Sequence, residues 1–172
     1  MKNKSEMVGL DQVADKNIQK LSIKKSINVK NSQKMPEKEV FLQDTQDHID
    51  AVSKVMSFLA QAVKQRGSRH DHTKIDYFEE FYDCFKTTKE DEQAILKELS
   101  WWRKHLEERH HLNDCVPEDV NIIDVLEMVV DCVCAGLARD GVVHEITIPN
   151  IVLSNAVKNT SALLQKIIEI KE

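Results

Sequence analysis

The residues of this sequence that could do chemistry are histidines and carboxylates that interrupt otherwise apolar helical patterns. The segment GSRHDHTKIDYF places His70 and Asp71 side by side, with Lys74 one turn further on. Imidazole nitrogens and carboxylate oxygens are ligands for divalent metal ions, and histidine favours transition metals. The full set of candidate site residues is His48, His70, Asp71, Lys74, His105, His110, His111, Glu127 and Asp131.

Bound metal ions would compensate for carboxylates that these patterns place on buried faces. Glu127 and Asp131 lie four residues apart in the apolar segment NIIDVLEMVVDCVCAGLARDG. Burying two such groups costs several kcal/mol unless a cation or a proton accompanies them. A metal ion also brings the pKa of its bound water near neutrality, and Lys74 could hold a phosphate oxygen. Glu127 could instead pair with an arginine, such as Arg103 or Arg139.

Helical patterns must position these residues. Apolar residues recur at helical spacing over about 45–65, 68–85, 90–108, 122–137 and 149–168. Only 4 glycines and 3 prolines in 172 residues favour an all-α protein. We therefore expect an all-α bundle of about five or six helices, formed by residues 41–172, behind a flexible lysine-rich extension at 1–40.

The same patterns predict where the candidate ligands lie. His48 shares an inward face of the first pattern with Val52, where a lone histidine is more often a core residue than a ligand. Asp71 heads an apolar stripe that continues through Ile75, Phe78, Tyr82 and Phe85. The third pattern ends before Pro117, which would let the chain fold back after His105. The fourth is apolar around nearly its whole circumference and is expected to be a central buried helix.

Charge and cysteine content narrow the class of protein. The net charge of −5 divides into about +4 for residues 1–40 and about −9 for the rest. An acidic body argues against a dedicated nucleic-acid binder. No apolar stretch is long enough to span a bilayer, and no signal peptide is recognised, so a cytoplasmic protein without a membrane partner is expected. The four cysteines form no CxxC pair and are expected to be buried free thiols.

The order of these residues resembles the HD-domain metal-dependent phosphohydrolases. His48, then His70-Asp71, then Asp131 are similar to the H…HD…D signature of that superfamily, and HDHTK is similar to its HD-x-x-K version, with Lys74 as the lysine. The resemblance implies an all-helical HD-like domain in which the four signature residues bind one divalent metal ion.

A second histidine cluster extends the resemblance. His105, then His110-His111, then Asp131 are similar to the H…HH…D order of dinuclear HD-domain members. The segments RGSRHDHTK, HLEERHH and LEMVVD are most similar to small bacterial and phage HD-like proteins, over residues 44–168. No GYP segment is present, so cyclic-dinucleotide hydrolysis is not implied. Glu-Arg stands where Asn-Pro usually precedes the histidine pair, which leaves open which of the pair is the ligand.

The resemblance implies an enzyme with two bound ions, or one, of manganese or iron, with zinc, magnesium, nickel or cobalt as alternatives. Metal-activated water would hydrolyse a phosphate ester or anhydride of a small nucleotide-like substrate. Lys74 would steady the phosphate, while Glu127 would orient a ligand or accept a proton. The alternatives are a di-iron HD-fold oxygenase and a non-catalytic metal- or ligand-binding module. The oligomeric state stays open.

Overall fold

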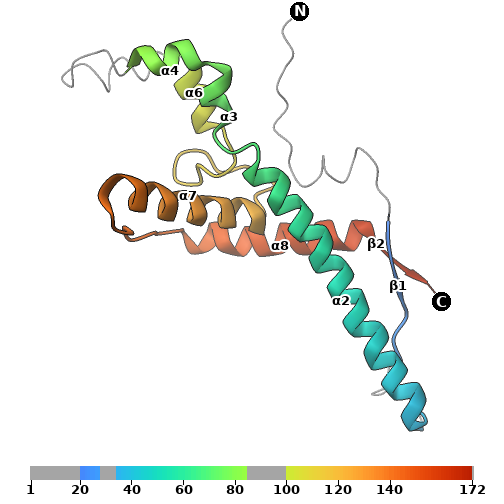
Figure 1. The fold of residues 1–172 in the computed structure, drawn as a ribbon. Helices are drawn as coiled ribbons and strands as arrows, with labels where there is room; N and C mark the ends of the chain where they lie inside the picture. Colours follow the sequence, from blue (N-terminus) through green and yellow to red (C-terminus); the bar gives the residue numbers. More distant parts are fainter. Residues whose placement is uncertain (1–19, 28–33, 85–99, 172) are drawn as a thin grey trace, which may run out of the picture. The chain divides into compact units, whose positions relative to one another are not determined.

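The part of the chain that the structure describes is mostly helical (Figure 1). The computed structural model describes residues 20–27, 34–84 and 100–171. Its helices are α2 (Lys38–Gly67), α3 (His72–Asp76), α4 (Phe78–Cys84), α6 (Ser100–Leu106), α7 (Ile122–Asp140) and α8 (Asn150–Ile167). A parallel pair of short strands, β1 (Leu21–Lys24) and β2 (Ile168–Lys171), completes the elements. The predicted all-α class is confirmed, and no helix among these residues is long and apolar enough to cross a membrane.

The described residues form two compact units. The site unit holds residues 65–160, and the strand unit holds the described residues before 65 and after 160. In the strand unit, β1 pairs with β2 in parallel, and Lys24 Nζ lies 3.0 Å from a carboxylate oxygen of Asp47 on α2. β1 and the start of α2 therefore lie within residues 1–40, the segment predicted as a flexible extension.

The core of the site unit lies between α7, the first part of α8 and the chain that leads into α7. It is formed by Leu112, Val120, Val125, Met128, Val152 and Ala156. A capping box starts α7, in which the Asn121 side chain accepts from the backbone of Ile123 and the Asp124 side chain accepts from the backbone of Asn121. Gly141 ends the helix with a φ of 71°, a conformation that favours glycine.

The turn after α7 brings the chain back against the helix at Gly136. A Cβ atom on Gly136 would lie 2.5 Å from the backbone oxygen of Val142. Only glycine permits this approach, because the obstacle is backbone and has no rotamer to change. The segment between Val142 and α8 forms no strand.

The prediction that α7 is buried on all sides is wrong. Leu126, Val130 and Leu137 are 43%, 52% and 53% exposed, and the buried residues of the helix lie on the side that contains Val125 and Met128. A helix with apolar residues on every face predicts complete burial only if enough of the chain surrounds it. The cysteines are free, as expected, but they are half-buried or exposed.

The predicted helix over residues 68–85 is divided in the structure. Asp71 has a φ of 56°, which no residue inside a right-handed helix adopts, and a second break at Tyr77 separates α3 from α4. The predicted apolar stripe is therefore not a buried face, and Ile75 and Phe78 are 73% and 50% exposed. Phe85 and residues 90–99 of the third pattern lie outside the described residues.

Candidate metal centre

Three segments of the site unit bring the predicted site residues together. The turn after α2 carries His70 and Asp71, α6 and the loop after it carry the other histidines, and α7 carries Glu127 and Asp131. The chain turns back after Leu106, as predicted, because the helix ends there and the next residues form turns. We name the resulting group the histidine cluster; its members are His70, Asp71, His105, His110 and His111.

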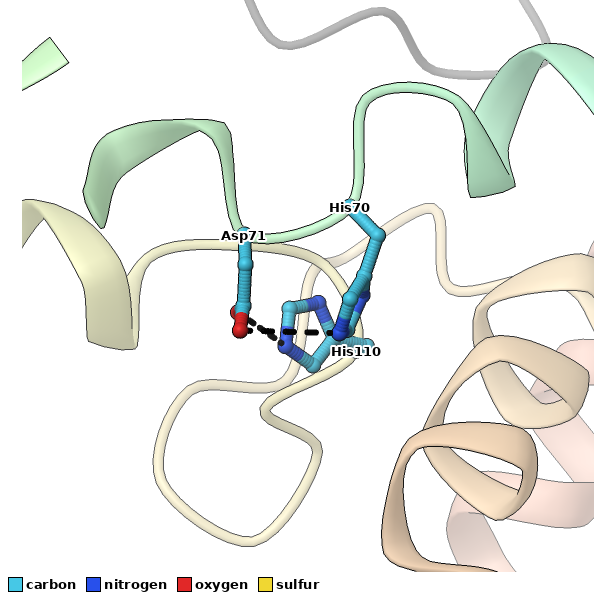
Figure 2. A group of neighbouring side chains, drawn as sticks. All are labelled: His70, Asp71 and His110. Carbon is cyan, nitrogen blue, oxygen red and sulfur yellow. Dashed lines mark ion pairs between the residues drawn. The ribbon is translucent and has the colours of Figure 1, made fainter. Parts of the chain in front are cut away.

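The first potential ligand group of the cluster is His70, Asp71 and His110. Figure 2 shows the two imidazoles and the carboxylate pointing toward one another from two chain segments. Asp71 Oδ2 lies 3.7 Å from His70 Nε2, and Asp71 Oδ1 lies 3.6 Å from His110 Nε2. Asp131 Oδ1 lies 3.2 Å from the same Nε2 atom of His70. Four side chains thus face one small volume.

The second potential ligand group is Asp71, His105 and His111. The Nε2 atoms of the two histidines lie only 3.0 Å apart, so a proton or a cation must lie between them. His105 Nδ1 is 3.7 Å from Asp71 Oδ1, the oxygen that also faces His110. Asp71 therefore belongs to both groups. This is the position from which one carboxylate could bridge two ions.

Several buried polar atoms of the cluster have no hydrogen-bond partner among the described residues. They are Asp71 Oδ1 and both ring nitrogens of His110. Oε2 of the adjacent Glu127 also has no hydrogen bond, although it lies 3.4 Å from Arg66 Nη1. Leaving such atoms unpaired costs about 1–3 kcal/mol each, so their clustering at one place needs a physical reason. Ligands about 2.1 Å from one ion lie about 3.0–3.4 Å apart. The distances of 3.0 and 3.2 Å fall in this range, and those of 3.6 and 3.7 Å exceed it by only a few tenths of an ångström. The residues present fit a divalent ion.

Glu108 accepts hydrogen bonds from the turn that carries Asp71. The backbone N–H groups of Asp71 and Thr73 donate to Glu108 Oε2 and Oε1, each at 3.1 Å, and the Thr73 hydroxyl also donates to Oε1. Glu108 and Thr73 are only 3% and 5% exposed. Sequence reasoning missed both residues. The only signal for Glu108 was a carboxylate three residues after His105, on the side where a helix would place it nearby.

Neighbouring charges shift the pKa values of the groups in the histidine cluster. Burial lowers the pKa of His110, but the carboxylates of Asp71 and Glu127 outweigh burial and raise that pKa to about 9. Burial raises the pKa of Asp71, but His110 and the Lys74 ammonium hold it well below its usual range. Burial and the neighbouring histidines lower the pKa of His111 to about 4. A proton on His110 thus supplies positive charge where a metal ion would otherwise supply it.

The two predicted catalytic residues lie against the cluster. Lys74 forms an ion pair with Asp71 one turn away. Glu127 Oε1 lies 3.2 Å from His70 Nδ1 and 3.5 Å from His110 Nδ1. The sequence suggested Arg103 or Arg139 as an ion-pair partner for Glu127, but the partner in the structure is Arg66.

A second buried group of charges lies beside the histidine cluster. Arg66 and Arg109 both bind Asp124, which has no exposed surface. We name Arg66, Asp124 and Arg109 the arginine cluster. Arg109 is 8% exposed and, through Asp124, supports the start of α7.

His48 is exposed on α2 in the strand unit and belongs to neither potential ligand group. It lies 19 residues before Gly67 on one continuous helix, a rise of about 28 Å at about 1.5 Å per residue. The helical spacing that placed His48 on an inward face also placed Val52 there, and Val52 is 48% exposed.

Comparison with known proteins identifies a family and gives no named relative. No curated protein and no solved structure matches the chain. Residues 37–170 match a family of unknown function, DUF5662. Because this match includes the site unit and most of the chain, the protein belongs to the DUF5662 family.

Proposed function

We propose that this protein is a metal-dependent phosphohydrolase that acts on a phosphate ester or anhydride of a nucleotide-like substrate. One or two divalent transition metal ions, manganese or iron by preference, would be held by the histidine cluster and Asp131. The proposal rests on the resemblance of the HDHTK, HLEERHH and LEMVVD segments to HD-domain hydrolases, together with the geometry of the site.

One observation carries the proposal: Asp71 presents an unpaired buried oxygen to histidines of both potential ligand groups. Asp71 Oδ1 is 3.6 Å from His110 Nε2 and 3.7 Å from His105 Nδ1, and it has no hydrogen-bond partner among the described residues. A structural ion pair would be expected to satisfy that oxygen. An acceptor left open between imidazoles is instead what a cation site requires.

The residues around the ligands have separable roles. Glu127 Oε1 faces His70 Nδ1 at 3.2 Å, so it can accept the N–H of that ring, and Nε2, which faces Asp71 and Asp131, would bind the ion once its own proton is displaced. Lys74 places its ammonium beside Asp71, where it could bind a phosphate oxygen. A bound divalent ion supplies a Lewis acid that generates hydroxide near neutral pH.

The proposal is tested by metal analysis and by hydrolysis assays on the same samples. The full chain, purified without a chelating tag, is expected to contain about two manganese or iron atoms and to release phosphate from members of a nucleotide panel. Asp71→Asn is expected to lose both properties while folding normally, because asparagine tolerates the positive φ of residue 71. Asp76→Asn, at an exposed carboxylate on α3, is the matched control and should keep both.

Three outcomes would contradict the proposal. Metal content without turnover on any phosphorylated compound would leave a binding module. Iron with visible absorbance and oxygen consumption, without phosphate release, would favour an oxygenase. No metal in wild-type protein, even after soaking with manganese and iron, would remove the metal centre itself.

A further inference from the structure

We infer that Glu108 is a positioning residue, which fixes both the backbone turn at Asp71 and the proton position on the His105 ring. The inference rests on the metal centre proposed above and extends it to a residue that belongs to neither potential ligand group. It is carried by three hydrogen bonds to one buried carboxylate and by the proton balance that they impose on Thr73 and His105.

The proton balance starts at Glu108. An ionised carboxylate can only accept hydrogen bonds, and this one accepts from two backbone N–H groups and from the Thr73 hydroxyl. The Thr73 hydroxyl has a single proton, and Glu108 takes it. Thr73 Oγ1 can therefore only accept from His105 Nδ1, which lies 3.0 Å away.

The consequence appears on the far side of the His105 ring. A neutral imidazole that carries its proton on Nδ1 has its lone pair on Nε2. That atom faces His111 Nε2 at 3.0 Å, within the second potential ligand group. Glu108, acting through Thr73, thus keeps the His105 lone pair aimed at the place where an ion would bind. Groups that orient ligating histidines in this way typically change metal affinity about 10- to 100-fold when removed.

Glu108 also holds the residue that both ligand groups share. The backbone N–H of Asp71 donates to Glu108 Oε2 at 3.1 Å, and Asp71 is the only non-glycine residue with a positive φ in the described part of the chain. A glutamine at position 108 has one acceptor oxygen and an amide group that donates. The glutamine side chain cannot accept hydrogen bonds at both positions where Glu108 does, so the turn at Asp71 loses one of the hydrogen bonds that support it.

The experiment reads the His105 tautomer and the metal affinity separately. The ¹⁵N shifts of histidine-labelled, metal-free full chain, recorded at about pH 8, where an ordinary histidine is neutral, should show the Nδ1–H tautomer for His105. Thr73→Val removes the relay but keeps the backbone hydrogen bonds to Glu108, so His105 should become a mixture of tautomers. Thr73→Ser should restore the wild-type pattern.

Titration with Mn²⁺ then measures the effect on binding. Glu108→Gln should weaken Mn²⁺ binding at both sites about 10- to 100-fold. Thr73→Val should weaken it only at the site that contains His105. Glu107→Gln, at the exposed neighbour that pairs with Lys104, should match wild type in both readouts.

An Nε2–H tautomer for His105 in the wild-type protein, or a Thr73→Val tautomer identical to wild type, would overturn the inference. Mn²⁺ affinity unchanged in Glu108→Gln would do the same. Failure of the wild-type protein to bind Mn²⁺ would overturn the proposed metal centre instead, and the NMR result would still decide the role of Glu108.

Discussion

The histidine cluster and the arginine cluster are two largely buried groups of charge that differ in how fully they are paired. In the arginine cluster, Asp124 accepts from Arg109 at 2.9 and 2.7 Å, from Arg66 at 3.0 Å and from the backbone of Asn121 at 2.9 Å. Both carboxylate oxygens are satisfied. In the histidine cluster, the ring nitrogens of His110 lie 3.5–3.8 Å from the nearest carboxylate oxygens and have no hydrogen-bond partner among the described residues.

The difference separates a structural ionic network from a site that needs another component. Buried charges remain in a fold when their partners satisfy them fully, and Asp124 meets that condition with protein groups alone. Asp71 and His110 meet it only in part, through electrostatic attraction over distances longer than a hydrogen bond. The arginine cluster therefore stabilises the start of α7, whereas the histidine cluster has unpaired buried atoms that the proposed metal ions would satisfy.

The largest expected effect comes from opening the arginine cluster. Asp124→Asn should lower the free energy of unfolding by about 3–5 kcal/mol, because it removes the buried carboxylate that the guanidinium groups of Arg66 and Arg109 share. Urea denaturation of the metal-free protein measures the change. Asp119→Asn, at the half-exposed partner of Arg109, is the control and should cost no more than about 1 kcal/mol. A similar small loss for Asp124→Asn would mean that the two clusters do not differ as described.

A smaller change in the free energy of unfolding should come from metal binding to the histidine cluster. Mn²⁺ at about 100 times its dissociation constant should raise the free energy of unfolding by about 2.7 kcal/mol per independent site. Asp71→Asn should abolish this increment, because Asp71 belongs to both potential ligand groups. Leu126→Ala, at an exposed side chain of α7, should retain it. An increment of equal size in Asp71→Asn would show that the ion binds elsewhere.

The proton on His110 gives a pH dependence that acts in opposite directions on stability and on metal affinity. Its pKa is raised from 6.5 to about 9, so its contribution to the stability of the metal-free protein is full below pH 6.5 and is lost as the pH rises through about 9. A metal ion must displace that proton, so affinity should rise about tenfold per pH unit up to about pH 9 and then level off.

Titration calorimetry with Mn²⁺ across this range measures the slope, and thermal unfolding of the metal-free protein measures the stability. The His110→Gln variant should lose both dependences. Affinity that is flat between pH 7 and pH 9 in the wild-type protein would contradict the proton on His110.

Helical spacing and residue type predicted much of the site, because both are local properties. The all-α class and the turn back after His105 followed from them. The division of the candidate ligands came from the resemblance to HD-domain proteins, which gave His110 to a second ion with His105, whereas the structure groups it with His70 and Asp71. The hydrogen bonds that Glu108 accepts could not be predicted in this way. They depend on a positive φ at Asp71, which the residue type does not predict. Asp71 headed an apolar stripe in the sequence, yet the chain turns at that residue, and the stripe it predicted is exposed.

His48 is where the predicted ligand set and the structure differ, and it gives the smallest expected effect. His48→Gln should leave the Mn²⁺ stoichiometry and affinity unchanged, because the side chain is exposed on α2 about 28 Å along the helix axis from Gly67. The unfolding free energy should change by no more than about 0.5 kcal/mol, as for an ordinary surface position. Loss of one bound ion in this variant would mean that α2 bends or breaks to complete a four-residue HD-type site. The histidine cluster would then be only part of the centre, and the contrast with the arginine cluster would have to include a ligand from the strand unit.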